Sequence, residues 1–191
     1  GAGKSTLLKL LIWLESPTSG RVIVDGFDLN KLKAKQLPWY RRQIGIVLQD
    51  HNLLPDRTVF ENVALPLRLN PMSAKDAARR VRGALATVDL SDKGALLPRH
   101  LSTGEQQRVG IARAVVTRPR IILADEPTGN LDPFLSRQVM ALFHQFRDLC
   151  TTVLVASHDI DLIKDQGCRI LHLSQGSLVQ DTAQKPGGEA Q

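Results

Sequence analysis

Residues 101–132, LSTGEQQRVGIARAVVTRPRIILADEPTGNLD, contain signals for a helix, a strand and a second helix. Residues 102–105 have the Ser-x-x-Glu spacing of a capping box, which predicts that a helix begins there. Residues 121–124 are a continuous apolar run, typical of a parallel strand that is buried on both faces. Asp132 followed by Pro133 predicts the start of a second helix, with an aspartate cap and proline at its first position. Helix, strand and helix in this order favour an α/β fold.

Further strands and helices extend this pattern on both sides. Short apolar or β-rich runs predict strands at 21–26, 43–50 and 151–159, and a hairpin at 169–180 that turns at Gln175–Gly176. Apolar residues at helical spacing predict a helix over 73–90. The alternation of strands with helices predicts a parallel sheet with helices on both faces.

The spacing of the strands predicts a subdomain inserted between two of them. About 70 residues that are mainly helical separate the strands at 43–50 and 120–126, which is too long for a single crossover. We therefore expect a core made of 1–52 and 119–182, a helical subdomain at 53–118, and a disordered tail at 183–191.

Composition narrows the classes of function. The chain has 191 residues, 42% of them hydrophobic, and no apolar run near the length of a membrane span. Its net charge of +6 would permit a nucleic-acid partner. However, the basic residues are dispersed and aromatic residues make up only 4%, so stacking platforms for bases are scarce and no nucleic acid is expected.

The N-terminal stretch GAGKSTLLKL carries the end of a phosphate-binding loop. Gly3, Lys4 and Ser5 fill the last three places of G-x-x-x-x-G-K-[ST]. Glycines let backbone N–H groups surround phosphate oxygens at a helix N-terminus, Lys4 would reach the β- and γ-phosphates, and Ser5 would ligate Mg²⁺. The first glycine of the pattern would precede Gly1, so we expect this chain to be a piece of a longer protein. The alternative is a small-residue loop before an ordinary core helix.

Polar residues follow three of the predicted strands. In open α/β sheets, ligands bind at the carboxyl ends of the strands. Asp125 there would hold Mg²⁺, and Glu126 would act as general base for an attacking water. Gln49 could offer its amide oxygen to the metal or to water, and His158 could contact the γ-phosphate and hold Glu126. The alternatives are a solvated acidic turn for the carboxylates and ordinary structural roles for Gln49 and His158.

The capping box at 102–105 has a functional interpretation too. A helix N-terminus with serine and glycine is a second phosphate site. Two such sites far apart in one chain suggest a head-to-tail dimer, in which the Ser102 end of one subunit closes over the nucleotide held by Lys4 of the other. The simpler reading is a well-capped helix.

The motifs in this order resemble the nucleotide-binding domain of ATP-binding cassette (ABC) proteins over residues 1 to about 180. The resemblance implies a RecA-like P-loop NTPase core with an inserted helical subdomain, an ATPase with ATP and Mg²⁺ as cofactors, and a homodimer with ATP sandwiched between the subunits. It makes 101–105 the signature loop and 129–132 the loop that contacts the other subunit. The implied nucleotide contacts are Gly1, Ala2, Gly3, Lys4, Ser5, Thr6, Ser102, Thr103, Gly104, Glu105 and Asp132. The implied metal ligands are Ser5, Gln49 and Asp125, and the implied catalytic residues are Glu126, His158 and Gln49.

Two longer segments, RRQIGIVLQDHNLLPDRTVFENVALPL (41–67) and QQRVGIARAVVTRPRIILADEPTGNLD (106–132), closely resemble the FtsE family of bacterial cell-division ATPases. This implies an integral membrane partner of the FtsX type that docks at Asp50–Leu67, and a peripheral location on the cytoplasmic face of the inner membrane. ATP-driven closure would then activate cell-wall hydrolases. A related lipoprotein-release or macrolide-export complex is the close alternative. A soluble ABC protein acting on DNA or ribosomes, and a scaffold that binds ATP without needing to hydrolyse it, are the others.

Two positions depart from the family pattern. Thr103 stands where the signature usually has glycine, and because the capping box survives we expect an altered phosphate fit and not a loss. Trp13 stands where relatives often have glycine or a small residue, so we expect it to affect packing at the end of the first helix.

Overall fold

The computed structural model describes residues 2–69, 72–164 and 166–183. The chain divides into two compact units, Gly1–Asn30 with Ser157–Gln191, and Lys31–Ala156. The predicted disordered tail therefore lies, from residue 184 on, outside the described residues, as does Gly1 of the predicted phosphate loop. The predicted boundaries of a core and a helical subdomain remain a prediction.

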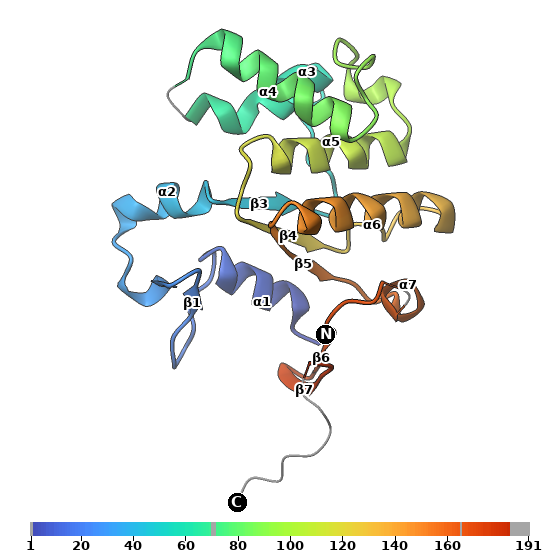
Figure 1. The fold of residues 1–191 in the computed structure, drawn as a ribbon. Coiled ribbons are helices and arrows are strands. Elements are labelled where there is room, and N and C mark those ends of the chain that lie inside the picture. Colours follow the sequence, from blue (N-terminus) through green and yellow to red (C-terminus); the bar gives the residue numbers. More distant parts are fainter. Residues whose placement is uncertain (1, 70–71, 165, 184–191) are drawn as a thin grey trace, which may run out of the picture. The chain divides into compact units, whose positions relative to one another are not determined.

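A three-stranded parallel sheet organises the unit Lys31–Ala156 (Figure 1). Its strands are β3 (Ile44–Val47), β4 (Ile121–Asp125) and β5 (Thr152–Ala156), in the order β3-β4-β5. Leu123 in the central strand pairs with Ile46 on one side and Leu154 on the other. The strands predicted at 43–50, 120–126 and 151–159 are thus confirmed, and their carboxyl ends lie at one edge of the sheet.

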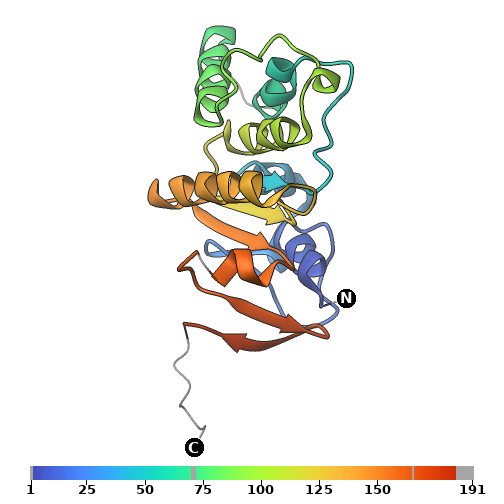
Figure 2. The ribbon, with the colours of Figure 1, turned by 90° about the vertical axis from the view of Figure 1, so that its right-hand side faces the viewer.

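Helices of this unit fall between the strands. Before β3 lie η2 (Ala34–Gln36) and α2 (Leu37–Arg41); between β3 and β4 lie α3 (Val59–Ala64), η3 (Leu65–Leu69), α4 (Ala74–Thr87), η4 (Pro98–His100) and α5 (Thr103–Val115); between β4 and β5 lies α6 (Pro133–Asp148). Helices α3, α4 and α5 pack on one another, α5 also packs on β3, and α6 packs on β5. Figure 2 shows α3, α4 and α5 gathered together within this unit.

Local sequence explains where these helices begin and which faces they bury. Ser73 accepts a hydrogen bond from the Asp76 N–H and caps α4, which buries Val81 and Leu85. Gly45 explains how closely α5 approaches the sheet, because a Cβ at this position would lie 2.5 Å from the Ala114 carbonyl oxygen. Only glycine fits this contact between strand and helix.

In the described residues, the unit formed by the two ends of the chain contains two α-helices, a short 3-10 helix and two hairpins. Its elements are α1 (Lys4–Leu11), β1 (Ile23–Val24), β2 (Phe27–Asp28), η1 (Leu29–Lys31), α7 (Ile160–Lys164), β6 (Leu171–Ser174) and β7 (Ser177–Asp181). The predicted hairpin is confirmed, since β6 and β7 pair antiparallel across a turn in which Gln175 and Gly176 both have positive φ. Such a turn matches the twist of the two strands.

Trp13 occupies a position at which helices favour glycine. Helix α1 ends at Leu11 with Ile12 as its cap, and Trp13 follows with a φ of 56°. The Leu14 N–H donates to the Lys9 carbonyl at 2.8 Å and the Trp13 N–H to the Leu10 carbonyl at 3.1 Å, the hydrogen bonds of a Schellman motif. The departure noted in the sequence therefore places a tryptophan in the left-handed conformation that glycine adopts without strain.

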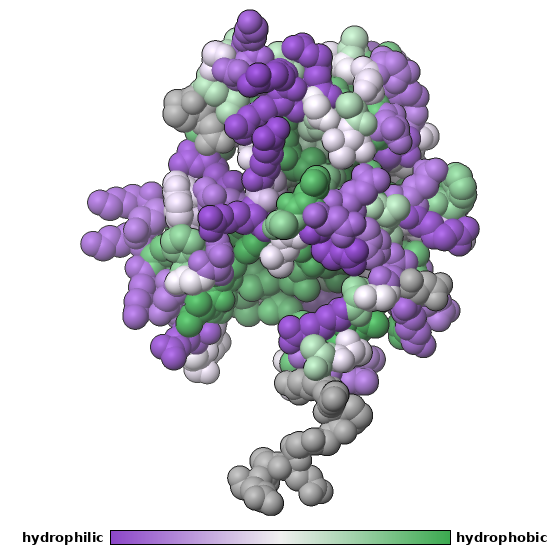
Figure 3. Space-filling model, viewed as in Figure 1, coloured by the Kyte–Doolittle hydropathy of each residue, from purple (hydrophilic) through white to green (hydrophobic). Residues whose placement is uncertain are grey.

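The surface of the α3–α4 region is largely polar. Figure 3 shows mostly hydrophilic side chains over the face of these helices that it presents. Arg79 and Arg82 are exposed on α4, and Arg79 pairs with Asp76 one turn earlier. Within the described ranges, none of the helices has both the length and the hydropathy needed to span a bilayer.

Candidate functional site

The phosphate-binding loop leads directly into α1. Gly3 caps this helix with a φ of 94°, a left-handed conformation that glycine adopts freely, and Lys4 is the first helical residue. The loop rests on the β6–β7 turn, because the Gly176 N–H donates to the Ala2 carbonyl at 3.2 Å and a Cβ on Gly3 would lie 3.3 Å from the Gly176 Cα. The hairpin thus supports the conformation that presents the N-terminus of α1.

The first turn of α1 suits an anion. It contains no acidic residue, and Ser5 and Thr6 are exposed there. The backbone N–H groups at a helix start carry a partial positive charge, which favours phosphate oxygens. The residues from Ala2 to Thr6 that the sequence predicts as nucleotide contacts therefore lie together at one helix end.

His158 belongs to the same unit and lies on the surface beyond the end of β5. The turn around it is well defined: the Asp159 N–H donates to Ser157 Oγ at 3.1 Å, and the Leu162 N–H donates to Asp159 Oδ1 at 3.0 Å. These hydrogen bonds fix the backbone around His158, whose imidazole is exposed.

In the other unit, β4 ends in the two predicted carboxylates. Asp125 Oδ1 is buried and has no hydrogen-bond partner among the described residues. A buried carboxylate oxygen without a partner fits a cation ligand, because such an atom is otherwise costly to bury. Among the described residues, however, no three His, Cys, Asp or Glu side chains gather into a group that would hold a metal by itself. Any cation here therefore needs additional ligands.

Glu126 has an unusual backbone conformation. Its φ is 46°, which is uncommon for a residue with a side chain, and its N–H donates to the Ala156 carbonyl at 2.8 Å. Strained backbone of this kind is concentrated at functional sites. The conformation turns the chain sharply at the carboxyl end of the central strand.

Gln49 lies beside this turn. A Cβ on Gly129 would be 3.2 Å from Gln49 Nε2 and 3.5 Å from the Glu126 carbonyl oxygen, so both groups pack against the same glycine. The Gly129 N–H also donates to the Glu126 carbonyl at 3.1 Å. The structure thus brings Gln49 and the turn that begins at Glu126 together, as the positions of β3 and β4 predict.

The predicted capping box is present at the start of α5. The Ser102 N–H donates to Glu105 Oε2 at 2.8 Å, and the Glu105 N–H donates to Ser102 Oγ at 3.3 Å. Lys93 forms an ion pair with Glu105, and it is the main reason that the pKa of this carboxyl lies below its usual value, followed by the Ser102 N–H. Thr103, the departure from the usual glycine, is the first residue of the helix and is exposed.

Asp132 caps α6 as predicted. Its Oδ1 accepts the N–H groups of Phe134 and Leu135 at 2.9 and 3.0 Å. Leu135 in turn packs on Gly104, since a Cβ on this glycine would lie 2.8 Å from Leu135 Cδ1. The helix that begins at the signature loop and the helix that Asp132 caps therefore touch at their first turns.

Arg113 holds the loop that follows Gln49, a role that no sequence motif predicts. Its guanidinium donates to the carbonyls of His51 and Asn52 at 2.6 and 2.8 Å, which ties the loop after Gln49 to α5. Burial lowers the pKa of Arg113, and burial is also the main cause of the lowered pKa of His51. Sequence reasoning did not identify Arg113 because its partners are backbone atoms about 60 residues away.

Asn62 anchors the other end of the same loop. This fully buried residue accepts the Leu54 N–H at 2.7 Å. It also donates to the carbonyls of Leu54, Arg57 and Thr58 at 3.0–3.1 Å. The segment between Gln49 and α3 is therefore fixed at both ends, although Leu54 within it is 44% exposed.

A family model described as ABC transporter matches residues 1–129. This chain belongs to the ABC transporter family. It is 53% identical over 178 residues to the cell division ATP-binding protein FtsE of Escherichia coli K12, covering 93% of this chain and 80% of that protein. It is 48% identical to FtsE of Mycobacterium tuberculosis, covering 95% of this chain and 79% of that protein.

Solved structures agree with this family. The dimeric post-hydrolysis structure of the ATP-binding cassette MJ0796 bound to ADP and Pi matches with a TM-score of 0.84 and 37% identity, covering 98% of this chain and 82% of that one. The predicted resemblance to FtsE, the α/β fold of an ABC ATPase domain and the ATPase class are thus confirmed.

Proposed function

We propose that this chain is the ATP-binding and ATP-hydrolysing subunit of a cell-division membrane complex of the FtsE/FtsX type. The observation that carries the proposal is the pair Asp125–Glu126 at the end of β4, with a buried unpartnered oxygen on one carboxylate and a left-handed backbone at the other. The extent of the match to FtsE, in both E. coli and M. tuberculosis, supports the cell-division role over lipoprotein release or macrolide export.

The nucleotide would be held by the start of α1. The backbone N–H groups after Gly3 and the ammonium group of Lys4 bind the phosphates, and Thr6 lies in the same turn. Ser5, Gln49 and Asp125 would hold Mg²⁺, whose coordination is completed by phosphate oxygens and water, as is usual for this ion. When bound, the ion neutralises the charge that develops on the phosphates.

The attacking water would be oriented by Glu126, with Gln49 and His158 as supporting residues. A carboxylate accepts a proton from water, an amide oxygen fixes the direction of a water O–H, and an imidazole can hold the γ-phosphate side. Glu126 has the left-handed backbone, with a φ of 46°, that is found more often at functional sites than elsewhere.

We further propose a homodimer with ATP between the subunits. The N-terminus of α5, with Ser102, Thr103, Gly104 and Glu105, would contact the nucleotide of the other subunit, and Ser102 and Thr103 are exposed there. Asp132 would lie at the same interface. The dimeric state of the similar MJ0796 cassette supports this arrangement.

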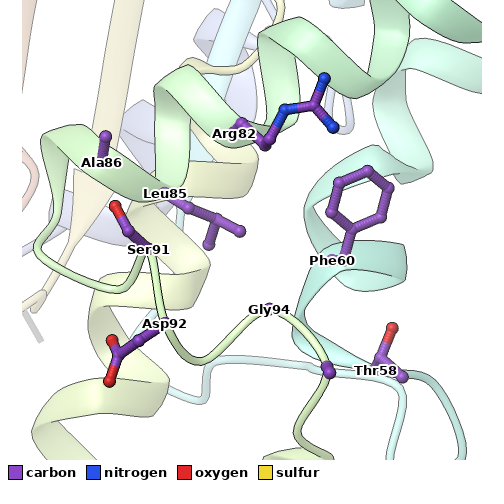
Figure 4. A pocket seen from close by; sticks show the side chains of 9 residues that line it. Thr58, Phe60, Arg82, Leu85, Ala86, Ser91, Asp92 and Gly94 are labelled. Carbon is purple, nitrogen blue, oxygen red and sulfur yellow. The ribbon is translucent and has the colours of Figure 1, made fainter.

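The membrane partner would dock at Asp50–Leu67 and place the complex on the cytoplasmic face of the inner membrane. This segment combines the half-exposed Leu54 with the fixed ends provided by Arg113 and Asn62. Thr58 and Phe60 of this segment line a groove of about 700 Å³, together with residues of α4 and of the loop that follows α4 (Figure 4).

Replacement of Glu126 by Gln tests the enzymatic part. The variant keeps the size of the side chain and removes the carboxylate, so it should still bind ATP and Mg²⁺ and form an ATP-dependent dimer, while hydrolysis falls by about a hundredfold or more. Gel filtration with ATP and a phosphate-release assay measure these effects. Wild-type turnover in the variant would mean that Glu126 is not the base.

A further inference from the structure

The loop that follows α4 is tied to α3 by main-chain hydrogen bonds. We call residues 91–97 the strap. The N–H groups of Val59 and Phe60, in the first turn of α3, donate to the carbonyls of Leu96 and Gly94 at 2.8 and 2.9 Å. These are N–H groups that a helix start leaves without partners inside the helix. The strap therefore follows any shift of the beginning of α3.

The strap also forms a wall of the groove next to the proposed docking segment. Ser91, Asp92 and Gly94 line it opposite Phe60, and Leu85 lies between them (Figure 4). Gly94 lies beside Leu85, since a Cβ on this glycine would make an ordinary van der Waals contact with Leu85 Cδ1 at 3.5 Å. An occupant of this groove would thus press on the strap and on α3 together.

The strap continues through η4 into the signature loop, and it also contacts this loop through the side chain of Lys93. Lys93 pairs with Glu105, and the side chains of the two residues are only 31% and 17% exposed. The same carboxylate accepts the Ser102 N–H through its other oxygen. The ion pair therefore holds the capping box itself.

This pair differs from the ion pairs Arg79–Asp76 and Arg57–Glu61 in what it joins. Arg79–Asp76 and Arg57–Glu61 connect residues one helical turn apart, and their side chains are 36–79% exposed. Lys93–Glu105 joins two different segments and is better shielded from water, so it is less weakened by solvent screening.

We propose that Lys93 is a positioning residue that transmits the position of the strap, and through it of α3 and the groove, to the Ser102–Glu105 end of α5. This inference rests on the proposed function, because it assigns the route by which a membrane partner docked at Asp50–Leu67 would alter the part of the chain that closes over ATP. Lys93 acts through Glu105 and does not itself contact the nucleotide.

The first test measures the ATPase activity of the protein alone and in vesicles with its co-expressed membrane partner. Lys93→Met should leave the activity of the isolated protein within about twofold and reduce the ratio of partner-stimulated to basal kcat by about two- to fivefold. Lys93→Arg keeps the charge and should retain the ratio. Lys75→Met, at an exposed position of α4, is the matched control and should behave as wild type. An unchanged ratio in Lys93→Met overturns the inference.

A second measurement separates the inference from the proposed function. In the isolated full-length protein, Lys93→Met should speed hydrogen exchange of the Ser102 amide by about two- to fivefold, with the Val59 and Phe60 amides unchanged. Glu105→Gln keeps an acceptor for the capping box but removes the charge. Because Lys93→Met has already removed the ion pair, adding Glu105→Gln to it should cause no further loss of ion-pair stabilisation. If the partner fails to stimulate even the wild type, the proposed docking fails. In that case unchanged Ser102 exchange in Lys93→Met overturns the role of Lys93, and faster exchange supports it.

Discussion

Gly104 and Leu135 are in direct contact: a Cβ on the glycine would lie 2.8 Å from Cδ1 of the leucine. The contact joins the first turn of α5 to the first turn of α6, which Asp132 caps. The two segments that we propose to face the other subunit are therefore packed on each other, and glycine at 104 is what allows the close approach.

Gly104→Ala should reduce stability by about 1–2 kcal/mol, because the new methyl group forces Leu135 to shift. The cost should be smaller in a Leu135→Ala background, in which the obstructing Cδ1 is gone. Chemical denaturation of the wild type, both single variants and the double variant gives the coupling energy. Equal costs in the two backgrounds would show that the contact does not restrict position 104.

Gly45→Ala should be far more harmful than Gly83→Ala. A Cβ at Gly45 would lie 2.5 Å from the Ala114 carbonyl oxygen, a main-chain atom that cannot move away without displacing α5. We expect a loss of about 2–4 kcal/mol in the free energy of unfolding. Gly83 lies exposed within α4 with nothing within 4 Å of the new methyl, so its replacement should stabilise the protein by about 0.5–1 kcal/mol. Thermal unfolding of the two variants should move in opposite directions.

Arg113→Lys should loosen the loop after Gln49. A lysine offers a single ammonium group in place of the planar fork that now reaches the carbonyls of both His51 and Asn52. The variant should lose about 1–2 kcal/mol of stability, and hydrogen exchange of residues 51–53 should become faster. Arg118→Lys, at an exposed position beyond α5, is the control. If both variants exchange alike, the guanidinium does not hold the loop.

The hairpin that supports the phosphate-binding loop should weaken in acid. Arg169, through a hydrogen bond to Asp181, is the largest cause of the lowered pKa of this carboxyl, followed by the Ala183 N–H. A carboxyl whose pKa is lower in the folded state than in the unfolded state contributes stability above its unfolded pKa of about 4, and this contribution is lost as the pH falls through the folded value.

Asp181→Asn should therefore lower the melting temperature at pH 7 and have less effect near pH 3, so that the two melting curves converge in acid. Melting temperatures of wild type and variant between pH 3 and 7 provide the measurement. A difference that stays constant over this range would contradict the role of the ionised pair.

Local signals predicted most of the fold. The capping box at Ser102, the aspartate cap at Asp132 and the turn at Gln175–Gly176 are recorded in residues close to one another in the chain, so they could be found without a structure. The three parallel strands were equally clear, because strands buried on both faces have continuous apolar runs.

Contacts between distant segments could not be found in this way. Lys93 lies 12 residues before Glu105, and nothing in the sequence separates it from an ordinary surface lysine. In the sequence, Leu135 is one more apolar residue of an amphipathic helix. The need for glycine at position 104 is therefore visible only once the contact with Leu135 is known. The left-handed backbone of Glu126 could not be predicted either, because no residue pattern indicates it.

We propose that this ABC ATPase works with a cell-division membrane protein. The most direct measurement is a pull-down from native membranes with full-length Glu126→Gln protein, held with ATP and Mg²⁺, and identification of the bound proteins by mass spectrometry. We predict an FtsX-type integral membrane protein together with division proteins. Capture of a lipoprotein-release or exporter subunit would contradict the cell-division assignment, and the absence of any membrane protein would contradict docking at Asp50–Leu67.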